Sequence, residues 1–291
     1  MVPWRAHADP MTATTDPAQR AYAFLQALAT DLSTERISFP TFTGATLRVR
    51  TALADPAIDA DRLARVISAE PLLGARLVQI ANSVAMNPGG KPVADVRNAV
   101  LRVGHDVVRA TAVAVAMEQL RAAKDVQVFH EQSEWIWRHS LEVAAIAYVV
   151  TRKMTRLNAD EALFAGLVHD IGRFYLLSRA AAYPDLVAHP DELDALIHEW
   201  HPSIGQAVLH EFHLADVALR AVAEHEHHVP AVPPRQLVDV ISIANRAALQ
   251  ANPPRYPAHV EREVPPLDPR VVQLISDSAE EVRTLLVALR G

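Results

Sequence analysis

The spacing of its prolines restricts the fold of this chain more than any other feature. Proline ends or kinks an α-helix, because it has no backbone N–H and its ring clashes with the preceding turn. Residues 93–183 contain no proline, whereas five prolines divide residues 36–92, at positions 40, 56, 71, 88 and 92. We therefore predict short helices before Val93. Three or four longer helices fit in residues 93–183, broken near Gly104, around 124–126 and around 157–160.

Apolar periodicity also favours helices. Between Glu134 and Met154, one helical stripe consists of His139, Val143, Ile146 and Val150, so His139 is expected to face the core with its apolar neighbours. Almost no segment has the polar–apolar alternation that a half-buried strand requires. Apolar residues make up 50% of the chain but aromatic residues only 5%, which favours close packing of small aliphatic side chains. We expect an all-α fold.

Composition along the chain predicts three parts. Residues 1–16 are a flexible N-terminal tail. Residues 17–251 are a helical domain, with an N-terminal part (17–125) and a core (126–251). Residues 252–291 are a proline-rich strap that leads to a C-terminal helix. Six prolines between Asn252 and Pro269 make that segment a poor helix. The helical spacing of residues 270–290 is consistent either with packing back on the domain or with self-association.

Charge and composition disfavour several classes of function. The net charge of −6 argues against a chain built to contact nucleic-acid phosphates. The absence of cysteine excludes disulfides, thiolate zinc sites and a cysteine nucleophile. No apolar run reaches membrane-spanning length, and residues 1–16 lack the apolar core of a signal peptide. We expect a cytoplasmic protein that contacts neither nucleic acid nor membrane.

The candidate chemistry centres on His169 and Asp170, which are adjacent at the end of an apolar run. Such a pair offers one neutral nitrogen and one anionic oxygen to a divalent metal, and burial without partners would be costly. His139 is a third candidate ligand. A structural interpretation stays open, in which His169 bonds a backbone carbonyl, Asp170 caps the next helix and His139 is a satisfied core histidine.

Several motifs occur in an order that resembles the HDOD family (HD-related output domain). Along the chain these are EPLLGARLVQIANS (70–83), AVLRVG (99–104), WRHSLEVAAIA (137–147) and LFAGLVHDIGRFYLL (163–177). The resemblance covers roughly residues 36–250. It implies a compact helical bundle related to HD metal-dependent phosphohydrolases, found in bacterial signalling and used as an output or protein-interaction module.

The resemblance also implies a ligand set. Superfamily ligand positions are held here by His139, His169 and Asp170, with His201 like the added histidine of HD-GYP phosphodiesterases and His225 like the first of their paired histidines. His227 and His228 offer a competing register for that pair. The implied cofactor is a divalent metal such as Fe, Mn, Ni or Mg.

Two departures from the pattern bear on activity. Asn245 stands where the superfamily has its closing aspartate; its carbonyl can bind a cation weakly but carries no charge. Asp239 lies six residues earlier and is expected to face another side of the helix. No segment resembles the Gly-Tyr-Pro loop of the cyclic dinucleotide phosphodiesterases.

Two functions follow as hypotheses. The first is a non-catalytic HDOD module that binds a regulatory protein, a second copy of itself, or a nucleotide or cyclic dinucleotide at a degenerate metal site. The second is a metal-dependent phosphohydrolase that holds its metal with His139, His169 and Asp170. Asn245 favours the first, because loss of an anionic ligand weakens a site for a divalent ion. Arg173, after Gly172, is expected to form a surface ion pair.

Overall fold

The computed structural model describes residues 16–33, 44–53, 55, 57–83, 86–87, 90–121, 124–210, 215–256 and 262–290. Residues 1–15 of the predicted tail lie outside this set. The described residues form helices and no strand, so the prediction of an all-α fold is confirmed. In chain order the helices are α1 (Pro17–Ser33), α2 (Gly44–Leu53), α3 (Ala60–Ser68), α4 (Pro71–Ala81), α5 (Val96–Arg121), the 3-10 helix η1 (Lys124–Phe129), α6 (His130–Met154), α7 (Ala159–Val168), α8 (Ile171–Ala180), α9 (Pro184–Val187), α10 (Pro190–His210), α11 (Asp216–Glu224), α12 (Leu237–Ala251), α13 (Pro269–Asp277) and α14 (Ala279–Arg290).

The helix breaks expected within residues 93–183 are present. Gly104 has φ = 76° inside α5, a conformation that residues with a Cβ rarely adopt, and it kinks the helix. η1 separates α5 from α6. Asn158 begins α7, because its side chain accepts hydrogen bonds from the backbone N–H groups of Asp160 and Glu161.

One further break was expected only in the structural interpretation of Asp170 as a helix cap: helix α7 ends at Val168 and α8 begins at Ile171. The two residues between them are His169, the C-cap of α7, and Asp170, the N-cap of α8. The candidate ligands therefore lie at a helix–helix corner rather than along one helix.

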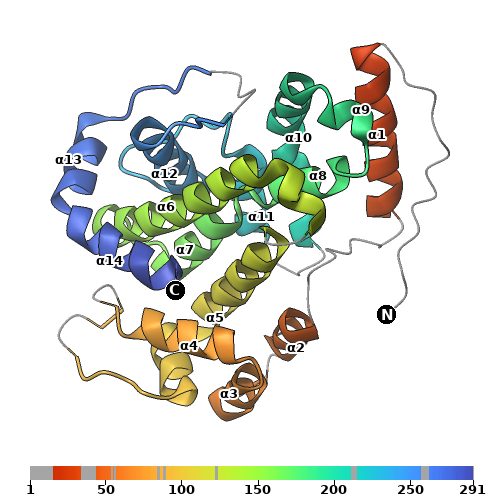
Figure 1. Cartoon of the computed structure of the whole chain (residues 1–291). Coiled ribbons are helices and arrows are strands. Elements are labelled where there is room, and N and C mark those ends of the chain that lie inside the picture. Colours follow the sequence, from red (N-terminus) through yellow and green to blue (C-terminus); the bar gives the residue numbers. More distant parts are fainter. Residues whose placement is uncertain are drawn as a thin grey trace.

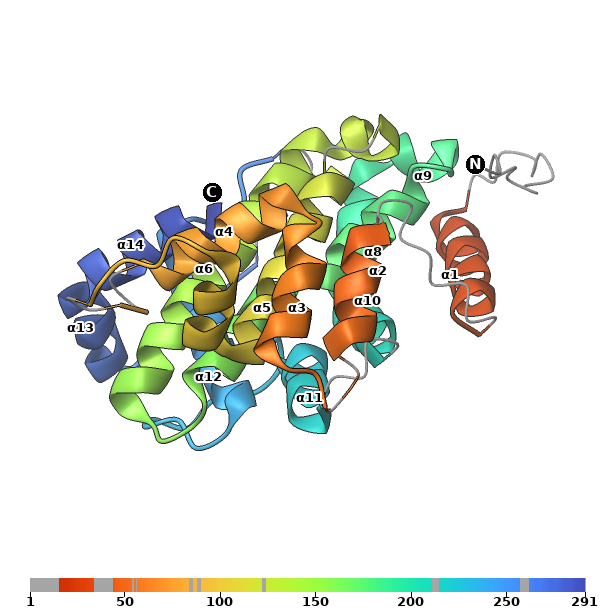
Figure 2. The ribbon, with the colours of Figure 1, turned by 90° about the horizontal axis from the view of Figure 1, so that it is seen from below.

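Helices α2 to α5 form the N-terminal part of the bundle (Figures 1 and 2). Asp59 caps α3 by accepting a hydrogen bond from Arg62 N, and Pro71 opens α4, where a missing N–H costs nothing. Leu73, Leu77 and Ile80 of α4 are buried, as their spacing predicts, and α4 packs along α5.

Helix α6 is the centre of the remaining bundle. It packs against α7, α12 and α14, and Figure 1 shows it running through the middle of the molecule. The predicted stripe from His139 to Val150 is buried on it. Among the described residues, no helix combines the length and apolar character needed to cross a membrane.

Two glycines allow helix backbones to approach closely. A Cβ placed on Gly166 of α7 would lie 2.8 Å from the Cα of Ala144 in α6. A Cβ on Gly172 of α8 would lie 2.0 Å from the carbonyl oxygen of His201 and 2.7 Å from the nitrogen of Gly205, both in α10. These contacts bring α6 against α7 and α10 against α8, which positions the histidines described below.

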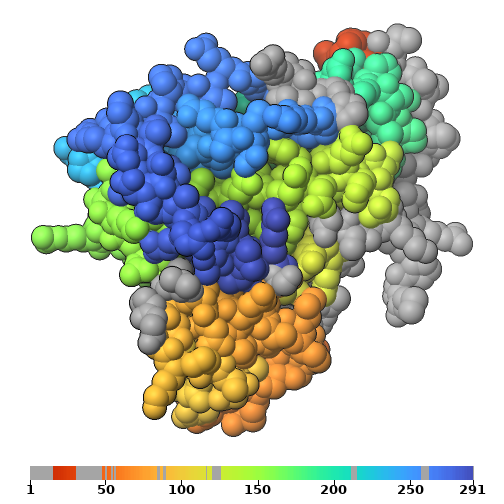
Figure 3. Space-filling model, turned by 60° about the vertical axis from the view of Figure 1, so that its left-hand side comes forward, coloured from red at the N-terminus to blue at the C-terminus, as the bar shows by residue number. Residues whose placement is uncertain are grey.

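The chain after α12 returns over the bundle. The described residues of the strap, 252–256 and 262–268, contain no helix. The helix expected over residues 270–290 is two helices, α13 and α14, which meet at Ser278. Helix α14 packs against α6 and α4, where Arg76 Nη2 donates a hydrogen bond to the Arg290 carbonyl (2.7 Å). Figure 3 shows these C-terminal helices lying over α6 and against the N-terminal part. The division of the chain into three parts stays a prediction.

Candidate metal centre

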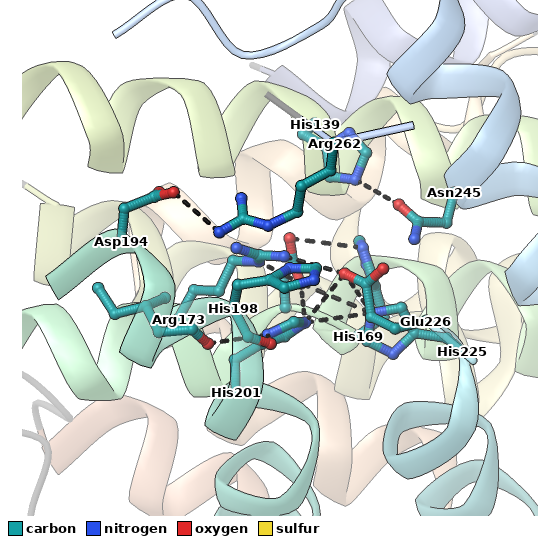
Figure 4. A network of polar contacts seen from close by, with 12 residues as sticks. His139, His169, Arg173, Asp194, His198, His201, His225, Glu226, Asn245 and Arg262 are labelled. Atoms are coloured by element: carbon teal, nitrogen blue, oxygen red, sulfur yellow. Dashed lines mark hydrogen bonds and ion pairs between the residues drawn. The ribbon is translucent and has the colours of Figure 1, made fainter. Parts of the chain in front are cut away.

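A group of polar side chains from separate helices lies in the middle of the bundle (Figure 4). His139 comes from α6, His169 and Asp170 from the α7–α8 corner, and Arg173 from α8. His201 comes from α10, His225 and Glu226 from the end of α11, and Asn245 from α12. Apart from the alternatives His227 and His228, all the sequence-predicted candidates are among them and are at most 4% exposed. The side chain of Glu226 is 13% exposed.

Three histidines are oriented in the same way. In each, Nδ1 lies within hydrogen-bond distance of a backbone carbonyl three or four residues earlier: Gly166 for His169 (2.7 Å), Val222 for His225 (2.7 Å), and Ile197 and His198 for His201 (3.0 and 2.8 Å). A carbonyl only accepts, so Nδ1 carries the proton and the neutral ring leaves the lone pair of Nε2 directed inward. Histidines that bind a metal through one ring nitrogen usually donate a hydrogen bond from the other, as Nδ1 does here.

Four of the inward atoms form a compact group, which we call the four-atom group: His201 Nε2, His225 Nε2, Asp170 Oδ1 and Glu226 Oε1. His201 Nε2 lies 3.3 Å from each carboxylate oxygen and 3.4 Å from His225 Nε2. His225 Nε2 lies 3.8 Å from the Asp170 oxygen and 3.6 Å from the Glu226 oxygen. All four atoms lie within 4.8 Å of one another.

His169 lies between His139 and the four-atom group: its ring centroid is 5.2 Å from that of His139 and 4.9 Å from that of His225. His169 Nε2 is 3.6 Å from Asp170 Oδ2 and has no hydrogen-bond partner among the described residues. His139 differs, because its Nε2 lies 2.8 Å from the Asn245 carbonyl oxygen, an acceptor. With that hydrogen bond, Nε2 of His139 carries a proton, and the ring's lone pair is on Nδ1, which is buried and has no hydrogen-bond partner among the described residues. The ring is also stacked on Trp135, with centroids 4.7 Å apart.

Arg173 joins the two carboxylates. Its Nε donates to Asp170 Oδ1 and its Nη2 to Glu226 Oε1, both at 2.9 Å. The expectation of a surface ion pair is wrong, because Arg173 is only 7% exposed: the first turn of α8 faces α10 and the end of α11 rather than solvent. Asp170 therefore does not cap α8 with its side chain.

Burial and charge determine the protonation states. Burial lowers the pKa of His139 and His201, and lowers that of His169 to about 3. Burial acts in the same direction on His225, but hydrogen bonding to Glu226 and the charges of Glu226 and Asp170 outweigh it and raise the pKa. Burial opposes ionisation of Asp170, yet Arg173 and the histidines hold its pKa below the usual range. Without a metal, Arg173 is the cation that hydrogen-bonds both carboxylates.

The metal-free protein is expected to lose stability as the pH falls from 7 to 5. His139, His169 and His201 have folded pKa values below the unfolded value of about 6.5, so unfolding takes up protons and stability is lost below that pH. His225, with a raised pKa, acts in the opposite direction but is outnumbered. Urea titrations at half-unit pH intervals measure the slope. A free energy of unfolding that stays constant or rises toward pH 5 would contradict these protonation states.

The remaining predicted alternatives lie elsewhere. His227 is exposed, and His228 Nε2 lies 2.6 Å from Asp239 Oδ1. Asp239 also accepts hydrogen bonds from the backbone N–H groups of Ala231, Arg235 and Gln236. It is therefore a cap for α12 and cannot replace an aspartate at Asn245.

Two residues of the centre were not predicted, Glu226 and Arg173. Glu226 follows His225, the C-cap of α11, where the chain leaves the helix and turns the next side chain inward. The position of Glu226 between histidines was the one sequence signal that it could belong to the centre. Helical periodicity could not predict its orientation, because Glu226 lies beyond the end of the helix.

The strap covers the centre. The Tyr256 hydroxyl donates to Asp194 Oδ1 (2.8 Å) and Arg262 Nη2 to Asp194 Oδ2 (3.1 Å). A cavity of about 20 Å³ lies between Arg173, Asp194 and Tyr256, large enough for one water and far below the several hundred Å³ of a typical substrate pocket. A wider surface hollow of about 810 Å³ lies along α1 and is lined by none of the residues of the centre.

The donor set fits a divalent metal. His169 Nε2 is a buried acceptor without a partner, and three imidazoles with fixed tautomers face two carboxylates. Such a mixture of neutral nitrogen and anionic oxygen suits zinc and neighbouring transition metals.

Comparison with known proteins gives a family and a fold. The HDOD domain model matches residues 39–228. A candidate metal-dependent phosphohydrolase from Shewanella amazonensis SB2B has a similar structure (22% identity, TM-score 0.68, 93% of this chain and 99% of that chain covered). An HDOD domain protein with unknown function from Geobacter sulfurreducens is also similar (21% identity, TM-score 0.61, 94% of this chain and 99% of that chain covered). A candidate signal transduction protein from Marinobacter aquaeolei VT8 is similar as well (16% identity, TM-score 0.57, 97% of this chain and 68% of that chain covered). These identities show a shared fold. No curated protein matches the chain.

Proposed function

This chain belongs to the HDOD domain family, and we propose that it is a signal-transduction module that works by binding a partner rather than by hydrolysis. The main support for this proposal is the 2.8 Å contact between His139 Nε2 and the Asn245 carbonyl oxygen. In the superfamily pattern, these positions hold the first and last metal ligands. Here they bond each other, so the ligand set implied by the resemblance is incomplete.

Burial of the centre supports the same proposal. A hydrolase must bring a phosphoester and a water to its metal, and catalytic metal sites keep an open coordination position. The small cavity that Arg173 lines has room for one water, and Tyr256 and Arg262 of the strap are hydrogen-bonded to Asp194, which also lines it. Partner binding would therefore use the outer surface of the helices.

The proposed partner is a regulatory protein in the cytoplasm of a bacterium, with a second copy of the chain as the simplest case. Binding of a nucleotide or cyclic dinucleotide is an alternative that thermal-shift titration separates from protein binding. A metal-dependent phosphohydrolase is the second candidate, favoured by the three inward-facing Nε2 atoms and by the name of the Shewanella protein. A divalent metal at such a site would supply an activated water.

Steady-state turnover tests this proposal. Purified protein supplemented with manganese, iron, nickel or zinc is assayed against bis-(p-nitrophenyl) phosphate, nucleotides and cyclic dinucleotides. We expect no turnover above that of the His169→Ala variant, which measures contaminating activity. A metal-dependent rate near 1 s⁻¹, typical of enzymes, would overturn the proposal. Asn245→Asp tests whether Asn245 is the reason for the missing activity, because this variant restores the aspartate of the superfamily pattern and is the single change most able to create hydrolysis.

A further inference from the structure

We propose that the face of α9 and α10 that holds α1 is a docking surface for a helix of a partner protein, and that α1 occupies it until the partner binds. We call this surface the α1-binding face and define it by Tyr183, the N-cap of α9, and Glu192, in the first turn of α10. The inference rests on the proposed function, because it names the surface and the kind of partner through which the module binds.

Three buried side chains attach α1 to this face. Arg20, Phe24 and Leu28 follow one another at intervals of four residues, lie on one side of the helix and are at most 6% exposed. Arg20 donates hydrogen bonds to both carboxylate oxygens of Glu192, from Nη2 to Oε1 (2.6 Å) and from Nε to Oε2 (3.1 Å). The Phe24 ring packs edge to face with Tyr183, with centroids 5.1 Å apart. Anchors on one stripe of an amphipathic helix are the means by which helices bind grooves in other proteins.

Helix α1 packs on one side only. It contacts mainly α10, and Figures 1 and 2 show it at the outer edge of the molecule. On its opposite side Tyr22 is 68% exposed, and among the described residues the surface hollow there is lined by α1 alone. The match to the HDOD domain begins at residue 39, after α1. Helix α1 is therefore an addition to one face of the family domain.

The α1-binding face is suited to an occupant of defined chemistry. Phe24 and Leu28 belong to the main hydrophobic core, so departure of α1 would expose the apolar surface that they cover, and exposed apolar patches mark sites of protein binding. Glu192 requires a basic side chain opposite it, and Tyr183 favours a ring. The partner is an amphipathic helix with a basic, an aromatic and an aliphatic residue at i, i+4 and i+8.

Attachment to the same chain makes α1 an internal competitor. Residues 34–43 join α1 to α2, and a helix joined to its site by a short link has an effective concentration on the order of mM. A free helix of equal affinity at micromolar concentration does not displace it. A second copy of the chain offers only such a helix, so the occupant is a different protein, one that binds the face more tightly than α1 does.

Binding of a fluorescein-labelled peptide of residues 16–33 to the full-length chain tests the inference. Arg20→Glu places a carboxylate against Glu192 and weakens the docking of α1. This variant should therefore bind the peptide at least about tenfold more tightly than the unchanged chain, because a larger fraction of molecules has the face open. Gln19→Glu, an acidic change on the exposed side of α1, should bind as the unchanged chain does. Circular dichroism checks that each variant is folded.

Exchanging the two charges shows whether the peptide uses the same face. Glu192→Arg should fail to bind the unchanged peptide but should bind a peptide that carries Arg20→Glu. The double variant Arg20→Glu/Glu192→Arg re-forms the ion pair within the chain and should exclude both peptides. Binding that ignores the charge at residue 192, or a folded Arg20→Glu chain that binds no more peptide than the unchanged chain, would overturn the inference.

Sedimentation of the unchanged chain distinguishes a separate partner from a second copy. We expect no dimer that depends on Arg20 at micromolar concentration, because each α1 occupies its own chain. A dimer that Arg20→Glu abolishes would assign the face to a second copy and overturn the choice of partner. Turnover is a separate readout: hydrolysis by a chain whose peptide binding follows these charges would overturn the proposed function and leave the docking surface standing.

Discussion

Arg173→Met is expected to lower the free energy of unfolding of the metal-free protein by about 3–5 kcal/mol, the usual cost of removing one partner from a buried ion pair. Arg173 is the guanidinium that hydrogen-bonds both Asp170 and Glu226. Without it, Asp170 and Glu226 would be two buried carboxylates with no guanidinium between them. Urea unfolding followed by circular dichroism at pH 7 measures the change.

Two comparisons make the Arg173 result specific. Arg270→Gln removes an exposed arginine that pairs with Asp268, and surface pairs contribute little, so it should unfold like the unchanged protein. Excess zinc should restore much of the stability of Arg173→Met, since a divalent cation supplies the missing positive charge. If the two arginine variants were equally stable without metal, the buried charge balance described here would be wrong.

Gly172→Ala is expected to destabilise the protein by about 3 kcal/mol, at the upper end of the usual cost of overpacking. The added Cβ would lie 2.0 Å from the carbonyl oxygen of His201 and 2.7 Å from the nitrogen of Gly205. Both are backbone atoms, so α10 must move as a unit and carry His201 away from Asp170. Thermal unfolding and zinc affinity should therefore fall together.

Gly74→Ala is the matched control. Its Cβ would lie 3.2 Å from a methyl group of Val96, a side chain that can adjust. Alanine is also favoured over glycine inside a helix by about 0.5–1 kcal/mol. We expect Gly74→Ala to be neutral or slightly stabilising, with unchanged zinc affinity. Equal effects at both glycines would show that α8 and α10 do not depend on the close approach.

The fold was accessible from the sequence because its signals are local. Proline spacing and helical stripes predicted an all-α chain, and the ordered motifs predicted the HDOD family. The corner at His169 and Asp170 was expected only in the structural interpretation of Asp170 as a cap, because the apolar run on either side is continuous. The break at Ser278 was missed for a similar reason, since helical spacing resumes on both sides of it.

The centre was accessible only in part. His139, His169, Asp170, His201 and His225 were candidates because their residue types bind metals, and the structure brings them together. Glu226 and Arg173 have types that are usually solvated. Their burial depends on where α11 ends and on which helices α8 faces, and both follow from tertiary packing that no local pattern encodes.

The anchoring of the strap at Asp194 has a consequence for how this domain is delimited. The region that matches the family model ends at residue 228, before Asn245 and before the two strap side chains that close over the interior. A fragment trimmed to that region would leave Trp135 without the Tyr256 ring that packs against it and open the histidine centre to water. The set of residues that packs around the centre is therefore longer than the matched region, and expression boundaries should include α14.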